Sequence, residues 1–186
     1  MKTIQITDNH KIKTSVLMDN LRKKFTVYSY WNNKELDNNF PQLEETTTRE
    51  FIVEQESSTM KGSSWNDMAD IRDDMMTFRE YILFFEAYHK ETGEYPDDKG
   101  WTLFKDSLPD GYVAYGRWYP GDRGVRFSWN GPGYRDSNCG ARVCLQSNGA
   151  HNRIITNEKD NRKQEVCVIC KQCGFQNPIG IQVVNM

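Results

Sequence analysis

The chain has 186 residues, with 24 basic and 26 acidic side chains and a net charge of -2 at pH 7. This length suits one domain with appendages or two small domains. The acidic balance argues against general affinity for nucleic acid, which usually shows as a basic domain. No apolar run reaches the roughly 18 residues of a membrane span, and the N-terminus has no stretch resembling a signal peptide. We therefore expect a cytoplasmic protein that does not contact the membrane.

The N-terminal part, residues 1–54, is predicted to contain a helix and strands. Apolar residues recur at helical spacing between Ile12 and Phe25, and the following FTVYSYW alternates as a strand does. A polar stretch with Pro41 predicts a loop before a short strand at Phe51. Residues 55–76 are rich in Ser, Asp and Gly, which predicts a linker with one helical turn near Trp65.

A second helix is predicted between Thr77 and Gly93. Thr77 and Glu80 have the spacing of a capping box, in which each side chain bonds the other residue's backbone amide. Phe78, Tyr81 and further apolar residues then form one stripe. Gly93 has the position of a C-terminal cap, and the proline that follows prevents continuation.

Four short segments after this helix have the composition of strands: WTLF, YVAYGRWY, GVRFSW and GARVCLQ. Their connections contain Pro, Asp, Asn and Gly, as turns require. The expected fold is α+β, with the amphipathic helix packed on a small antiparallel sheet. This recognition core covers residues 77–146, and a polar connector and a cysteine-rich tail follow over residues 147–186.

Arginine and aromatic residues alternate within the predicted strands. Residues 111–145 contain five Arg and two Asp and no Lys, a net charge of +3 in an acidic chain. A planar guanidinium binds carboxylates and phosphates and stacks on rings. Alternation predicts that Val125 and Phe127 are buried. The predicted ligand surface consists of Tyr115, Arg117, Tyr119, Arg126 and Tyr134. The alternative is that these are ordinary solvent-facing strand positions.

The stretches TTTREF, TFREYILFFEAYHKETG, GWTLF and DSNCGARVCL resemble uncharacterised proteins of small-genome bacteria. The last stretch also resembles the C-type-lectin-like fold of formylglycine-generating enzymes and of the variable proteins of diversity-generating retroelements. In that family a Ser-x-x-Gly-aromatic-Arg strand ends the domain; Ser137, Gly140 and Arg142 match it, and Ala141 replaces the aromatic residue. The resemblance implies a sheet that displays residues for binding a protein or glycan. The enzymatic branch needs a cysteine pair on an earlier strand, whereas Cys139 and Cys144 fall on the closing one.

Three of the five cysteines lie close together near the C-terminus. Cys167, Cys170 and Cys173 form two overlapping Cys-x-x-Cys units, and CKQCGFQNP resembles a zinc-ribbon knuckle. A closed zinc site needs four ligands. The fourth could be Cys139, Cys144, His151 or a residue of another chain, while unligated thiols are the alternative. A disulfide between Cys139 and Cys144 is a lesser alternative, because an odd count without a signal peptide favours free thiols or a metal.

These patterns favour non-catalytic recognition of a protein or glycan over catalysis, since no catalytic motif is present. Two alternatives remain. One is a zinc-ribbon-like protein associated with nucleic acid, and the other is an oxidase-like enzyme with a cysteine-bound metal. The sequence does not identify the ligand or the oligomeric state.

Overall fold

The computed structural model describes residues 2–53 and 60–145, and all of them belong to one compact unit, residues 1–145. In chain order, the elements as far as the second helix are β1 (Thr3–Asp8), α1 (Thr14–Arg22), β2 (Val27–Tyr28) and α2 (Asn33–Asn39). There follow β3 (Thr47–Ile52), the 3-10 helix η1 (Trp65–Asp74) and α3 (Phe78–Thr92). The remaining strands are β4 (Trp101–Ser107), β5 (Val113–Tyr119), β6 (Gly124–Asn130), β7 (Cys139–Ala141) and β8 (Cys144–Leu145).

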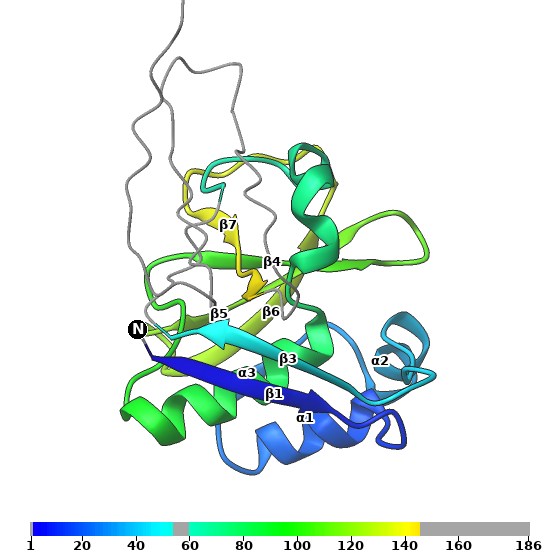
Figure 1. Cartoon of the computed structure of the whole chain (residues 1–186), viewed down its shortest axis with the longest axis vertical. Helices are drawn as coiled ribbons and strands as arrows, with labels where there is room; N and C mark the ends of the chain where they lie inside the picture. Colours follow the sequence, from blue (N-terminus) through cyan, green and yellow to red (C-terminus); the bar gives the residue numbers. More distant parts are fainter. Residues whose placement is uncertain (1, 54–59, 146–186) are drawn as a thin grey trace, which may run out of the picture. The chain divides into compact units, whose positions relative to one another are not determined.

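The strands form two sheets (Figure 1), a three-stranded one in the order β1-β3-β8 and a five-stranded one in the order β2-β6-β5-β4-β7. The α+β class is therefore confirmed. The prediction of a purely antiparallel sheet is wrong, because β2 runs parallel to β6 and β7 runs parallel to β4. Both exceptions join segments that are distant in sequence, and local turn signals cannot predict such pairings.

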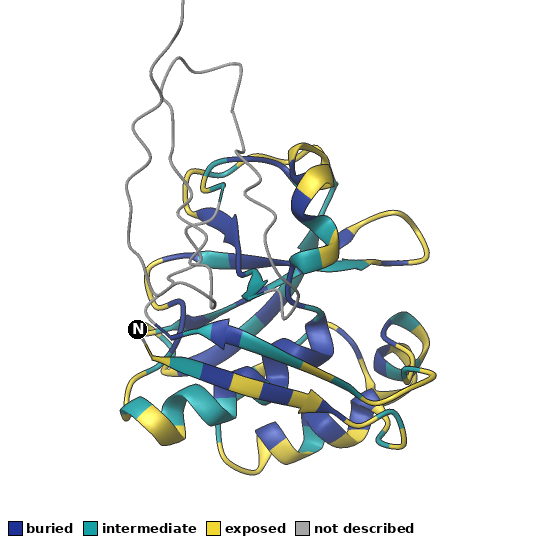
Figure 2. Ribbon diagram, in the orientation of Figure 1, coloured by how far each residue is buried: buried dark blue, intermediate teal, exposed yellow. Residues whose placement is uncertain are grey.

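Residues 2–53 pack directly on the rest of the unit. β1 alternates buried and exposed residues, seen as stripes along its arrow in Figure 2, and its apolar residues Ile4 and Ile6 belong to the core. No specific strand was predicted for Thr3–Asp8, and β1 is a strand paired antiparallel with β3. The predicted boundaries between residues 54 and 55 and between 76 and 77 thus fall inside the unit, as η1 does.

The helix α3 lies between the two sheets. Its Thr77–Glu80 capping box and the left-handed Gly93 at its C-terminal end, with φ of 74°, confirm the predicted helix. Phe84 meets Phe51 of β3, with ring centroids 6.1 Å apart. From the other side of the helix, Phe78 and Tyr81 contact the rings of Phe104 on β4 and Phe127 on β6. Because both sides of α3 are covered by sheets, its apolar residues are buried nearly all round.

The inner face of the five-stranded sheet forms part of this core. Val125 is 0% and Phe127 2% exposed, which confirms the predicted alternation along β6. Gly116 stands between the rings of Phe104 and Phe127, where a Cβ would lie 2.9 Å from the first and 3.0 Å from the second. Only glycine therefore fits at this point of β5 without moving an inner-face ring. Residues on the other face, here called the outer face, point away from α3.

Candidate functional site

The outer face of the five-stranded sheet carries a continuous row of rings and guanidinium groups. Register places Arg117 directly opposite Arg126 across β5 and β6, and Tyr28 of β2 beside Arg126. The Arg117 guanidinium lies 5.2 Å from the ring centroid of Trp101 and 5.2 Å from that of Tyr119. The Arg126 guanidinium lies 4.2 Å from the Tyr119 ring and 5.7 Å from the Tyr28 ring. We call this row, in the order Trp101, Arg117, Tyr119, Arg126 and Tyr28, the ring–arginine ladder.

The ladder draws on four neighbouring strands. Trp101 is the first residue of β4, Arg117 and Tyr119 lie on β5, Arg126 on β6 and Tyr28 on β2. Each cation lies against two rings, and stacking of this kind stabilises by roughly 0.5–1 kcal/mol per pair at exposed sites. The arrangement restricts the long arginine side chains and keeps their charged ends flat on the sheet.

Backbone carbonyls and one carboxylate fix the two arginines further. Arg117 donates Nε to the Trp118 carbonyl at 3.0 Å and Nη2 to the Asp98 carbonyl at 2.5 Å. Arg126 donates Nη2 to the carboxylate of Asp122, four residues earlier in the β5–β6 turn. Both side chains therefore approach a single conformation before any ligand arrives.

Two further predicted residues lie beside the ladder. Tyr115 contacts Trp101 edge-on with centroids 4.8 Å apart, and Asn130 Nδ2 donates to the Tyr115 hydroxyl at 3.4 Å. Burial, and more weakly the neighbouring Cys139 thiol and the phenols of Tyr134 and Tyr30, raise the pKa of Tyr115. Tyr134, in the loop after β6, is 49% exposed. Four of the five predicted residues thus lie on the outer face, and Tyr134 lies in the loop after β6.

Sequence reasoning missed Trp101, Tyr28 and Tyr30 as members of this region. Tyr28 is 47% and Tyr30 73% exposed, and Tyr30 packs edge-on against Trp129 at 4.8 Å. Alternation alone could have placed Trp101 on one face of its strand. It could not have shown that β2, almost 100 residues earlier than β6, adds Tyr28 to the same face, because the β2–β6 pairing is a long-range parallel contact.

The helix η1 covers another part of the five-stranded sheet. It packs against β4, and the Trp65 indole donates Nε1 to the Phe104 carbonyl at 2.9 Å. The outer-face residues Leu103 and Ala141 are buried there. At the ladder, in contrast, the outer-face side chains of β2, β5 and β6 are half-exposed or exposed. The ladder is therefore the open part of this face.

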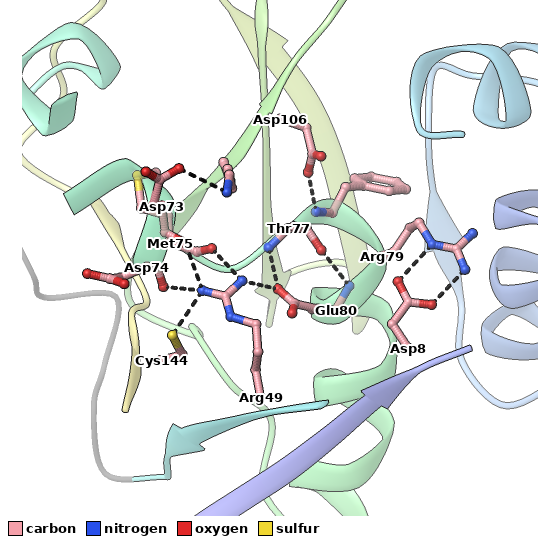
Figure 3. Close-up of polar contacts among 12 residues, drawn as sticks. Asp8, Arg49, Asp73, Asp74, Met75, Thr77, Arg79, Glu80, Asp106 and Cys144 are labelled. Atoms are coloured by element: carbon pink, nitrogen blue, oxygen red, sulfur yellow. Dashed lines mark hydrogen bonds and ion pairs between the residues drawn. The ribbon is translucent and has the colours of Figure 1, made fainter. Parts of the chain in front are cut away.

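A second polar cluster lies between β3 and the start of α3 (Figure 3). Arg49 donates to the Glu80 carboxylate at 2.9 Å, to the backbone carbonyls of residues 73–75 and to Cys144 Sγ at 3.0 Å. Glu80 also accepts the Thr77 amide at 2.8 Å as part of the helix cap. These contacts connect three segments and β8, so the cluster has a structural role.

Burial raises the pKa of two thiols and of one carboxyl group near these clusters. It raises the pKa of Cys139 to about 12, and it raises the pKa of Cys144 in spite of the nearby Arg49 cation. Both cysteines are free thiols, so the alternative of a disulfide between them is not realised. Burial also raises the pKa of Asp106 to about 6, although this carboxylate accepts the Phe78 amide at 2.6 Å.

Among the residues that the structure describes, two ion pairs are buried on both sides. Arg142 donates Nη2 to Asp97 Oδ1 at 2.8 Å, with side chains 2% and 0% exposed, and Arg79 donates to both oxygens of Asp8. Asp97 also accepts the Thr102 hydroxyl at 2.8 Å. Buried pairs of this kind persist only when hydrogen bonds satisfy both partners, so Arg142 serves the core and is not displayed for a ligand.

A cavity of about 720 Å³ borders this pair near the end of α3. Its ionisable lining consists of Lys61, Lys99 and Arg142 against Glu94, Asp97 and Asp98, together with the tyrosines 88 and 95. Positive and negative groups balance in this lining.

Within residues 2–53 and 60–145, no three His, Cys, Asp or Glu side chains are grouped so that they could hold a metal ion. The predicted zinc ligands Cys167, Cys170 and Cys173 lie outside the described residues. In the part of the chain that the structure describes, no helix has the length and apolar composition to cross a membrane.

Comparisons with known proteins found no family model, curated protein or solved structure that matches this chain.

Proposed function

We propose that this protein is a non-catalytic recognition module that binds a protein or glycan through the outer face of its five-stranded sheet. The ring–arginine ladder is the observation that carries this proposal. Tyr, Trp and Arg are the residues that contribute most to binding energy in interfaces, because they bury large areas and direct strong hydrogen bonds. Here they form one open row, and their conformations are already restricted.

The packing of the ladder supports recognition more than a role in stability. Cores bury rings against rings, as α3 does, whereas Tyr28 of the ladder remains about half-exposed, at 47%. Exposed aromatic groups rimmed by polar side chains mark interaction sites. Restricted side chains also lose little entropy on binding, which increases affinity for a given set of contacts.

The test is a comparison of ligand capture by the full chain and by ladder variants. The wild type would be screened against a displayed peptide library and a glycan array. The affinity of each ligand found would then be measured for the wild type, Y28A and Y119A. We expect at least a tenfold loss of affinity for Y119A and a smaller loss for Y28A. The melting temperature of each variant should stay within a few degrees of the wild-type value. A matched control is Y112A, because Tyr112 is 44% exposed but precedes β5 outside the ladder. Equal binding by all variants would exclude the ladder as the site.

Two further proposals concern the fold and the tail. A C-type-lectin-like fold is supported by the position of the Ser137–Arg142 motif, whose residues 139–141 form β7 at the edge of the five-stranded sheet. Zinc binding by Cys167, Cys170 and Cys173 is supported by their spacing alone. Elemental analysis of the purified full chain tests it: zinc would support a structural site, copper would support the oxidase-like alternative, and absence of metal would remove both.

A further inference from the structure

On the basis of the proposed function, we propose that the ladder binds an acidic polypeptide segment in which two carboxylate residues are separated by one residue. The two carboxylates would bind the guanidinium groups of Arg117 and Arg126. Three observations support this ligand: the unused donors of the two guanidinium groups, the charge of the surface and the spacing between the two cations.

Each guanidinium keeps donors that no described residue uses. Arg117 donates Nε and Nη2 to two backbone carbonyls. Its Nη1 donates no hydrogen bond to residues 2–53 or 60–145. Arg126 donates Nη2 to Asp122, and its Nη1 likewise has no acceptor among the described residues. Its Nε also has no partner there, but it is buried, so Nη1 is the donor left for a ligand. Guanidinium donors without acceptors favour a ligand that supplies anionic oxygens.

Charge also favours an acidic ligand. Among the five arginines of residues 111–145, Arg126, Arg135 and Arg142 form ion pairs with Asp122, Asp67 and Asp97. Arg117 forms none within the described residues, and its acceptors are neutral carbonyls. The outer face therefore carries uncompensated positive charge at Arg117, in a chain whose total charge is -2. A complementary anion would bind at this point.

The spacing of the two cations matches an extended peptide. Both guanidinium groups lie against the Tyr119 ring, at 5.2 Å and 4.2 Å from its centroid, so they are less than about 10 Å apart. In an extended chain residues i and i+2 project to the same side, and their spacing is roughly 6.6 Å. Two acidic side chains at i and i+2 can therefore reach both cations. Adjacent acidic residues would project to opposite sides and reach only one.

A nucleic acid fits this surface less well. Specific protein–DNA contacts typically neutralise about six to ten phosphates, whereas the ladder offers two cations. A neutral glycan supplies no anionic oxygen for the free donors. The density of Tyr, Trp and Arg side chains is instead typical of protein interfaces.

The experiment selects peptides from a random displayed library on the immobilised full chain. We expect enrichment of Asp or Glu at positions i and i+2. The tightest peptide would then be measured against the wild type, R117Q, R126Q and R117K, with melting curves for each. R117Q and R126Q should each weaken binding about 10- to 100-fold, since a charge-assisted bond is lost, and R117K should restore only part of the loss because lysine lacks the fork.

Two matched controls separate this ligand from general electrostatic attraction. R123Q removes the same charge from the β5–β6 turn outside the ladder and should change affinity less than threefold. A peptide of the same composition with its two acidic residues adjacent should bind about tenfold more weakly than the selected one.

The outcomes distinguish this inference from the proposed function. Selected peptides without acidic enrichment, or equal binding by R117Q and the wild type, would overturn the acidic ligand. If such peptides nevertheless failed to bind Y119A, recognition through the ladder would still be supported. Retrieval of no peptide would also overturn this inference, and the glycan array would then test the face independently. Failure of ladder variants to affect any ligand would overturn both.

Discussion

Arg117 on β5 and Arg126 on β6 are direct cross-strand partners, so two cations occupy neighbouring positions on the outer face. Like charges placed opposite each other in an antiparallel pair are destabilising. The structure compensates by stacking both guanidinium groups on Tyr119 and by pairing Arg126 with Asp122. A sequence that breaks a local stability rule in this way is expected to do so at functional sites.

Removal of one of these cations should therefore have little effect on stability. For R117Q and R126Q we expect the free energy of unfolding to change by less than about 1 kcal/mol, because lost stacking is offset by lost repulsion. Urea unfolding followed by circular dichroism measures this. A destabilisation above about 2 kcal/mol in either variant would show that the ladder mainly supports the fold.

The buried Arg142–Asp97 pair should behave in the opposite way. D97N removes the negative charge and leaves the Arg142 cation buried, which is expected to cost about 3–5 kcal/mol in the free energy of unfolding. Asparagine suits this position, because residue 97 has a left-handed φ of 57° and Asn tolerates that conformation. Urea unfolding provides the measurement, and a D98N variant at the neighbouring exposed position is the control. A loss below 1 kcal/mol for D97N would contradict the assigned role of the pair.

The capping box of α3 gives a third prediction. Thr77 accepts the Glu80 amide at 3.1 Å, and T77A removes that acceptor. We expect a loss of about 1–2 kcal/mol in unfolding free energy, whereas T77S, which keeps the hydroxyl, should lose much less. Equal losses in T77A and T77S would indicate that the methyl group matters more than the hydrogen bond. Thermal and urea unfolding of both variants decide the matter.

The raised pKa of Asp106 predicts that the free energy of unfolding depends on pH. Its pKa is about 6 in the folded chain and has an ordinary value of 3.8, so the folded state holds the proton more tightly. The contribution of this carboxyl to stability is therefore fully present below pH 3.8 and is lost as the pH rises through about 6. Over this interval the loss is on the order of 2–3 kcal/mol.

The variant D106N isolates this effect, because asparagine keeps an oxygen for the Phe78 amide and cannot ionise. Compared with the wild type, D106N should gain stability as the pH rises from 4 to 8, by an amount on the order of 2–3 kcal/mol. Urea unfolding at several pH values measures the difference. A difference that is independent of pH would show that the carboxyl titrates normally in the folded chain.

The thiols of Cys139 and Cys144 should react slowly with iodoacetamide in the native protein. Burial raises the pKa of both, to about 12 for Cys139, and only the thiolate is nucleophilic. At pH 8 we expect both to be alkylated at least a hundredfold faster in urea than in buffer. Mass spectrometry of the two peptides provides the measurement. Rapid native alkylation of Cys139 would place it at an accessible site.

Local rules determined much of this protein. The α3 helix follows from Thr77, Glu80 and Gly93, because capping and left-handed turns depend on residues within a few positions of each other. Alternation along β5 and β6 separates buried Val125 and Phe127 from the displayed Arg117 and Arg126, since a strand presents successive side chains to opposite faces.

The tertiary structure decided the rest. The parallel pairing of β2 with β6 adds Tyr28 to the ladder, and β4 adds Trp101 beside Arg117. The same packing encloses Arg142, a residue of the charged stretch, against Asp97 and removes it from the display surface. Which arginines are free and which are paired depends on contacts between residues up to about 100 positions apart. Such contacts depend on how the whole core packs, and no short stretch of sequence encodes them.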